Sequence, residues 1–183
     1  MRRIAATFSV AAFLFGIGLM ASPNNNVSRG LRGVNLCVGG ERVVYSCQFG
    51  AKIGSVCLGR TSLHYRFGRR NQAEIDVASV ADWSNIHVGG NRSQVGLNQD
   101  FIRFTSGRTH YVVHAGATGP LNDDPGRRIS GIEVLEGDAA EEIASLPCKA
   151  SSDFRQAFYD ISVAAPDHWD GDEPTGTAFP MVY

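Results

Sequence analysis

The sequence lacks the short motifs that usually mark a catalytic or metal-binding protein. It contains no G-x-S-x-G elbow to expose a hydrolase serine and no glycine-rich phosphate loop between a strand and a helix. It also has no D-x-[DN]-x-[DN]-G calcium loop and no C-x-x-C pair to present two thiolates to zinc. These absences remove motif-based support for a serine hydrolase, a nucleotide-binding enzyme and the common calcium and zinc modules.

Lysine is scarce. Among 17 basic residues only Lys52 and Lys149 are lysine, and the formal net charge is −1. A nucleic-acid-binding surface needs a concentrated positive field, so we expect no nucleic-acid partner. The preference for arginine follows either from genomic base composition, which is the simpler account, or from selection for guanidinium groups at an interface.

The N-terminus has the three-part organisation of a secretory signal peptide. Met1-Arg2-Arg3 is positively charged, residues 4–20 are apolar, and Ala21-Ser22-Pro23 supplies small residues. We therefore predict a signal peptide over residues 1–21 and a periplasmic or secreted protein. A transmembrane anchor is the alternative, but residues 4–20 are at the short limit for spanning and include two glycines, so we expect no stable membrane anchor.

Composition divides the remaining chain into three parts. Residues 22–34 are rich in asparagine and poor in apolar side chains, which predicts a flexible leader. Residues 35–165 are expected to form a single β-rich domain. Residues 166–183 are rich in proline, glycine and acids, which predicts a disordered acidic tail.

The four cysteines predict two disulfide bonds. Cys37, Cys47, Cys57 and Cys148 are an even number in a chain that is expected to be exported, so we expect them to be oxidised and to bind no metal. Three pairings can be drawn, and the sequence leaves them open. Cys47 and Cys57 lie on two strands of a predicted hairpin, where a bridge between them would depend on the pair geometry.

Short alternating runs separated by turn residues predict a mainly β fold. The expected strands are residues 42–47, 53–58, 62–67, 72–77, 101–104, 109–113 and 129–135. Residues 83–97 are ambiguous. Residues 138–145 begin with an aspartate that can cap a helix, and they predict one short helix ended by Pro147. The expected architecture is a small antiparallel sandwich or barrel with one short helix, braced by disulfides.

Arginines gather at the turn of a predicted hairpin. Arg66, Arg69 and Arg70 lie near Tyr65, and both residue types are enriched where proteins bind proteins, which makes the arginines candidate binding residues. The simpler alternative is a charged rim that keeps strand edges from aggregating. By alternation, Arg66 and Glu74 are candidates for a cross-strand pair.

Two histidines invite a metal interpretation. His110 and His114 are four residues apart on a predicted strand, which separates them by about 13 Å. Two imidazoles that far apart cannot bind one ion at about 2 Å each. We interpret them as ordinary strand histidines and expect no metal and no cofactor.

Two stretches resemble known groups of proteins. The run from Ser46-Cys47 to Cys57, followed by Tyr65-Arg66-Phe67-Gly68, is similar to a pattern (SC-x9-C … YRFG) of small exported bacterial β-proteins of uncharacterised function. That resemblance covers residues 37–77 and implies a compartment and a fold type but no activity.

The stretch Ser106-Gly107-Arg108-Thr109-His110-Tyr111 resembles the Ser-Gly…Tyr loop that periplasmic inhibitors of lysozyme insert into the catalytic cleft of the enzyme. This resemblance implies that Ser106, Gly107 and Tyr111 bind a partner. A rigid turn of that kind offers a hydroxyl and backbone amides to catalytic carboxylates.

The function expected from the sequence is that of an exported, non-enzymatic binding protein. Its expected partner is another protein of the cell envelope, and one form of this hypothesis is an inhibitor or immunity-type partner of a cell-wall-degrading enzyme. Two alternatives stay open. A hydrolase of envelope polymers would show a cleft with two acids, or with an acid and a histidine, whereas a structural envelope component would have no discrete site.

Overall fold

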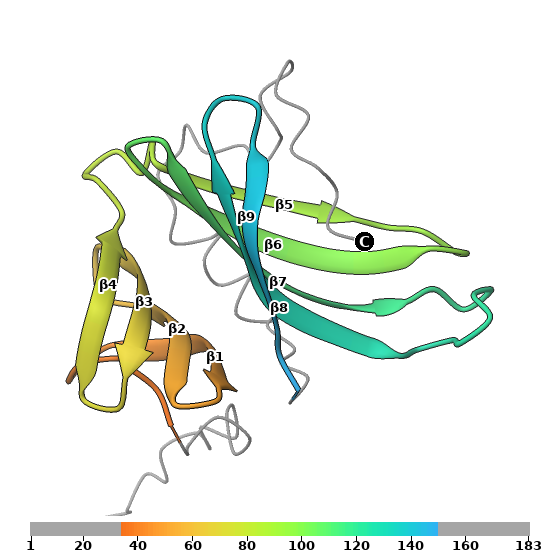
Figure 1. Ribbon diagram of the computed structural model, residues 1–183, viewed down its shortest axis with the longest axis horizontal. Coiled ribbons are helices and arrows are strands. Elements are labelled where there is room, and N and C mark those ends of the chain that lie inside the picture. The colour runs from red at the N-terminus through yellow and green to blue at the C-terminus, as the bar shows by residue number, and fades with distance from the viewer. Residues whose placement is uncertain (1–33, 150–183) are drawn as a thin grey trace, which may run out of the picture.

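The computed structural model describes residues 34–149, which form two antiparallel β-sheets (Figure 1). The predicted signal peptide (1–21), the predicted tail (166–183), most of the predicted leader (22–34) and the last residues of the predicted domain (35–165) lie outside the described residues. Among residues 34–149, no helix has the length and the hydrophobicity needed to cross a membrane.

The strands form two simple meanders. The first sheet has the order β1-β2-β3-β4 and the second the order β5-β6-β7-β8-β9, so each strand pairs with its neighbour in sequence. The bounds are β1 Arg42–Phe49, β2 Lys52–Leu58, β3 Leu63–Arg69, β4 Gln72–Ala78, β5 Ile86–Asn91, β6 Leu97–Ser106, β7 Thr109–Thr118, β8 Arg128–Glu136 and β9 Glu141–Pro147. The mainly β fold predicted from the sequence is confirmed, in the form of a sandwich of two sheets.

The predicted helix over residues 138–145 is wrong, because this segment forms a turn and then strand β9. Gly137 and Ala140 take positive φ values of 72° and 52°, which a right-handed helix cannot accommodate. Ala140 is 5% exposed and packs with Val112 and Leu135. Pairing with β8 and this contact therefore outweigh the local helical preference.

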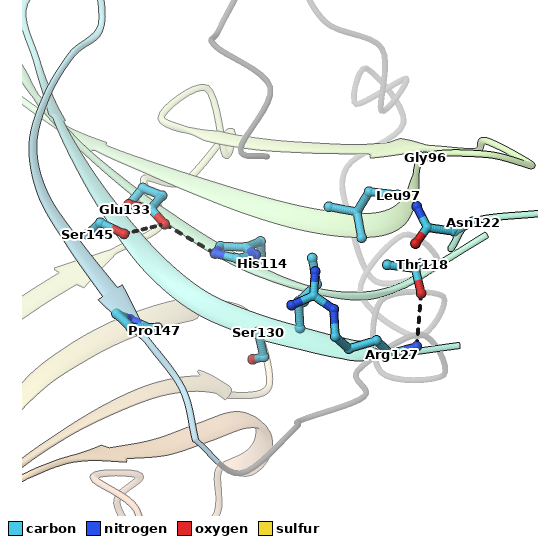
Figure 2. A pocket seen from close by; sticks show the side chains of 11 residues that line it. Gly96, Leu97, His114, Thr118, Asn122, Arg127, Ser130, Glu133, Ser145 and Pro147 are labelled. Atoms are coloured by element: carbon cyan, nitrogen blue, oxygen red, sulfur yellow. Dashed lines mark hydrogen bonds and ion pairs between the residues drawn. The ribbon is translucent and has the colours of Figure 1, made fainter. Parts of the chain in front are cut away.

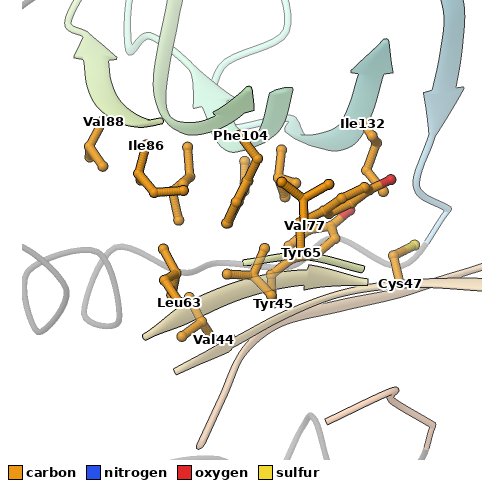
Figure 3. Packing of buried hydrophobic residues seen from close by; sticks show 14 of the residues in the cluster. Val44, Tyr45, Cys47, Leu63, Tyr65, Val77, Ile86, Val88, Phe104 and Ile132 are labelled. Carbon is orange, nitrogen blue, oxygen red and sulfur yellow. The ribbon is translucent and has the colours of Figure 1, made fainter. Parts of the chain in front are cut away.

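The core lies between the two sheets (Figure 3). Tyr45 and Tyr65, from the first sheet, are at most 1% exposed, as are Phe104 and Ile132 from the second. The ring of Tyr65 stacks on that of Tyr111 with 4.9 Å between centroids, and the hydroxyl of Ser130 donates a hydrogen bond of 3.3 Å to that of Tyr45. Burial, the main cause, raises the pKa of Tyr45 to about 12, so its hydroxyl stays neutral.

Two disulfide bonds brace the sandwich, as the sequence predicted. Cys37, which precedes β1, is bonded to Cys57 on β2 with 5.4 Å between Cα atoms. Cys47 on β1 is bonded to Cys148, which directly follows β9, with 6.0 Å between Cα atoms. In the β1–β2 hairpin Cys47 is opposite Gly54, so it does not face Cys57. The second bond is therefore a covalent link between the two sheets.

Candidate functional site

A pocket of about 400 Å³ lies against β7, β8 and β9 (Figure 2). His114 on β7 and Glu133 on β8 contribute to its wall. Their neighbours Val113 and Ile132 belong to the core between the sheets. Because side chains alternate along a strand, His114 and Glu133 point to the opposite face of the five-stranded sheet. The wall on the side of β9 includes Ser145.

A buried acid and a buried base meet in this pocket. His114 and Glu133 are 6% and 4% exposed, and the imidazole Nε2 lies 3.4 Å from the carboxylate Oε1. The hydroxyl of Ser145 donates a hydrogen bond of 3.0 Å to the same Oε1. Within residues 34–149, Glu133 Oε2 and His114 Nδ1 are buried without a hydrogen-bond partner. Such groups cost about 1–3 kcal/mol each, and buried polar atoms of folded proteins usually have a partner, either a protein group or an ordered water.

The imidazole has room because the opposite residue is a glycine. His114 is paired with Gly131 across the β7–β8 ladder. A Cβ on Gly131 would lie 2.8 Å from Nε2 of His114 and 2.9 Å from the carbonyl oxygen of Leu146. Both distances are shorter than real Cβ contacts, so Gly131 is required for the observed position of the ring over β8.

The far end of the pocket is formed by the β7–β8 connection. The backbone N–H of Arg127 donates a hydrogen bond of 2.9 Å to the hydroxyl of Thr118, and the guanidinium Nε lies 3.4 Å from the exposed carboxylate of Asp124. Both charged side chains of this pair are more than half exposed, so their ion pair is weak. In Figure 2 the Arg127 side chain extends toward His114.

The arrangement does not form a serine relay. In a serine hydrolase the histidine accepts the proton of the nucleophilic hydroxyl, and an acid orients the histidine from its other side. Here the hydroxyl of Ser145 binds Glu133, so the acid stands between the serine and His114. Among the described residues that line the pocket, Glu133 is the one carboxylate, whereas the usual glycosidase needs two on opposite sides of the bond.

Arg66, one of the predicted binding residues, is 5% exposed and its guanidinium is occupied within the chain. It donates hydrogen bonds of 2.5 and 3.0 Å to Glu41 and one of 2.9 Å to Asp76. The expected cross-strand pair with Glu74 is wrong, because Arg66 is paired with Asp76 across β3–β4 and Glu74 forms an ion pair with Lys52.

The network around Arg66 shifts the pKa of both of its acids. Hydrogen bonds from Arg66 hold the pKa of Glu41 below its ordinary value despite partial burial. For Asp76, burial acts to raise the pKa, but the hydrogen bonds and the electrostatic attraction of Arg66 and His64 together outweigh burial and lower the pKa. These ion pairs hold the segment before β1 against the first sheet.

The other predicted binding residues lie at two turns. Arg69 and Arg70 are exposed at the β3–β4 turn. Ser106 and Gly107 are exposed at the two-residue β6–β7 turn, where Gly107 has a φ of 62° that favours glycine. Tyr111 is not part of this tip, because its ring packs against Tyr65 in the core. The structure therefore separates Tyr111 from the Ser-Gly turn that the resemblance grouped with it.

One cluster of metal-type ligands occurs within residues 34–149. Atoms of Cys37, Glu41 and Cys57 lie within 4.8 Å of one another. The two sulfurs are bonded to each other, so they are not thiolates, and the cluster offers a metal one carboxylate.

Comparison with protein families, with curated proteins and with solved structures found no match to this chain.

Sequence reasoning overlooked most of the pocket. From the sequence His114 stands out only as a rejected metal ligand, and Glu133 lies unremarked within the predicted strand over residues 129–135. Ser145 was hidden because its segment was assigned to a helix. One signal in the sequence could have located the site. His114 and Glu133 each alternate with apolar core residues, which places both on the outer face of the sheet. A strand assignment for β9 would then have placed Ser145 opposite Glu133.

Proposed function

We propose that this protein is an exported, non-enzymatic binding protein and that the pocket between β7, β8 and β9 is its binding site. The observation that carries this proposal is the buried pair of His114 and Glu133 with atoms that lack partners among the described residues. Burying such groups without partners destabilises a fold, and a ligand that supplied the missing hydrogen bonds would offset this cost.

The same pocket meets the condition set above for the hydrolase alternative, since it holds an acid and a histidine. Two features favour binding over hydrolysis. Ser145 is bonded to the acid rather than to His114, and the described lining residues supply no second carboxylate.

Export is supported by the two disulfide bonds, which form and persist in oxidising compartments. It is also supported by the sequence features of the N-terminus, which lie outside the described residues. The proposed location is the periplasm or the extracellular medium.

The first test asks whether the buried pair serves the fold or a ligand. In the double variant His114→Phe with Glu133→Met, apolar groups of similar shape replace both partners. We expect its free energy of unfolding in urea to equal or exceed that of the wild type, because apolar replacement of a buried pair is often neutral or stabilising. A loss greater than about 1 kcal/mol, the size of an ordinary buried hydrogen bond, would assign the pair to the fold and contradict the proposal.

The second test measures binding directly. Thermal shift of the oxidised protein would be recorded with four classes of small solute: amino acids, short peptides, monosaccharides and fragments of digested peptidoglycan. We expect at least one class to raise Tm in a saturable manner, and we expect Glu133→Gln to remove the effect. Glu142→Gln, at an exposed position on β9, is the matched control. No shift with any class would contradict a small-ligand site.

A second candidate function is inhibition of a cell-wall-degrading enzyme by the β6–β7 turn. The supporting observation is the exposure of Ser106 and Gly107 at a narrow hairpin tip. The protein would be added to a panel of lysozymes, and stoichiometric loss of muramidase activity is the expected result. Replacing Ser106 and Arg108 by alanine should then restore activity, whereas Arg70→Ala serves as a control on another turn. Unchanged lysozyme activity would remove this function.

A further inference from the structure

The pocket has opposite charges at its two ends. Glu133 provides a carboxylate beside β9, and Arg127, which directly precedes β8, provides a guanidinium. Ile129, on β8, lies between them in the sequence and lines the pocket with an apolar side chain. A ligand that complements this order carries a cation at one end, an anion at the other and an apolar or neutral middle.

The spacing of the two charges selects a ligand longer than an amino acid. Glu133 and Arg127 are six positions apart along an extended chain, which separates their Cα atoms by about 20 Å, and their side chains cover part of this distance. The ammonium and carboxylate of one amino acid share a carbon and cannot reach both groups. An extended peptide adds about 3.3–3.6 Å for each residue, so a peptide of a few residues can.

The residues that line the pocket also favour a peptide over a sugar as the ligand. No Phe, Tyr or Trp side chain is present among the described residues that line the pocket, and the aromatic ring of His114 belongs to a residue that is 6% exposed, so a sugar ring would find little stacking surface. The neutral polar groups include a hydroxyl at Thr118 and an amide at Asn122, beside Arg127, and the hydroxyl of Ser145 beside Glu133. The hydroxyl of Ser130, which also lines the pocket, donates its hydrogen bond to Tyr45. Leu97 and Ile129 supply apolar surface between them, which suits small side chains of a peptide.

We propose that the pocket binds a short free peptide, with the N-terminal ammonium at Glu133 and the C-terminal carboxylate at Arg127. This inference rests on the proposed function, because it assigns the chemical class of the ligand to the same pocket. An ammonium group has three donors for the carboxylate, whose Oε2 has no partner within residues 34–149. The guanidinium of Arg127 can exchange its weak contact with Asp124 for a forked contact with the peptide carboxylate.

The experiment is a calorimetric titration of the oxidised protein with trialanine in three forms: free, N-acetylated and C-amidated. We expect the free peptide to bind, the acetylated form to bind about 30-fold more weakly and the amidated form about threefold more weakly. The difference follows from burial, because Glu133 is buried and Arg127 is exposed.

Two variants connect each end of the peptide to its residue. In Glu133→Gln we expect the free and acetylated peptides to bind with equal affinity and the amidated peptide to bind more weakly than the free one. In Arg127→Gln we expect the free and amidated peptides to bind with equal affinity and the acetylated peptide to bind more weakly than the free one. Exposed controls are Glu142→Gln and Arg70→Gln. Equal affinity of the wild type for free and capped peptides would overturn the peptide assignment. The assignment would also be overturned if a monosaccharide bound to the wild type and Glu133→Gln abolished that binding. The latter result would leave the proposed function standing, whereas binding of no solute class would remove both.

Discussion

The disulfide bond between the two sheets should stabilise the fold more than the disulfide bond within the first sheet. The Cys47–Cys148 bond closes a loop with a sequence separation of 101, and the Cys37–Cys57 bond one of 20. In the chain-entropy treatment, the cost of closing a loop in the unfolded chain grows with the logarithm of its length. The expected stabilisation is about 4.7 kcal/mol for the longer loop and about 3.3 kcal/mol for the shorter one.

The two bonds are well matched for comparison. Each joins one buried cysteine (Cys47 at 4% and Cys57 at 0% exposure) to a half-buried one, so loss of packing should be similar in both. Urea unfolding would be measured for Cys47→Ala with Cys148→Ala and for Cys37→Ala with Cys57→Ala. We expect the first double variant to be about 1.4 kcal/mol less stable than the second. An equal or larger loss in the second would refute loop length as the determining factor.

Three further predictions concern side chains at defined positions. Arg66→Met should cost about 3 kcal/mol in urea unfolding, because it leaves the partly buried carboxylate of Glu41 without its partner. Arg70→Met, at an exposed turn, should cost under about 0.5 kcal/mol, and equal effects of the two variants would contradict the network. Because the folded-state pKa of Glu41 lies below its ordinary value of 4.5, the stability it contributes is present above that pH and is lost as the pH falls through the folded pKa. Glu41→Gln should flatten the pH dependence of unfolding below about pH 4.5, and an unchanged slope would count against this assignment. Gly131→Ala should lower the free energy of unfolding in urea by about 1–3 kcal/mol, because the new Cβ would lie too close to its neighbours. Gly39→Ala, with open space around its Cβ, should be nearly neutral. An equally small effect of Gly131→Ala would show that the imidazole can move aside.

Most of the fold could be predicted because alternation is a local signal. Leu63, Tyr65 and Phe67 alternate with polar neighbours, and β3 contains all three residues. The segment over residues 83–97 is ambiguous because its alternating pattern is short. Ile86 and Val88 are two positions apart and both reach the core, but the alternation does not continue beyond them. The strand β9 was missed for a different reason. Its Glu and Ala residues favour a helix locally, and its place at the edge of the sheet depends on pairing with β8, which no local pattern encodes.

The disulfide pairing also lay beyond local reasoning. Cys148 approaches Cys47 because the second sheet packs across the first and ends beside β1. The neighbours of a cysteine in sequence carry no information about that crossing. The sequence therefore leaves the three pairings open, and the arrangement of the sheets decides between them.

The candidate site was the least predictable part because it depends on register across three strands. His114, Glu133 and Ser145 come from β7, β8 and β9, and each looks like an ordinary polar residue within its own strand. Shifting β9 by one residue would turn Ser145 to the other face and leave the carboxylate without its hydroxyl donor. The arginine cluster shows the opposite case: Arg66 stood out in the sequence, yet folding placed it in an internal ion-pair network. A conspicuous residue in a small β-sandwich can thus serve the fold, while an inconspicuous pair on the outer sheet face forms the pocket.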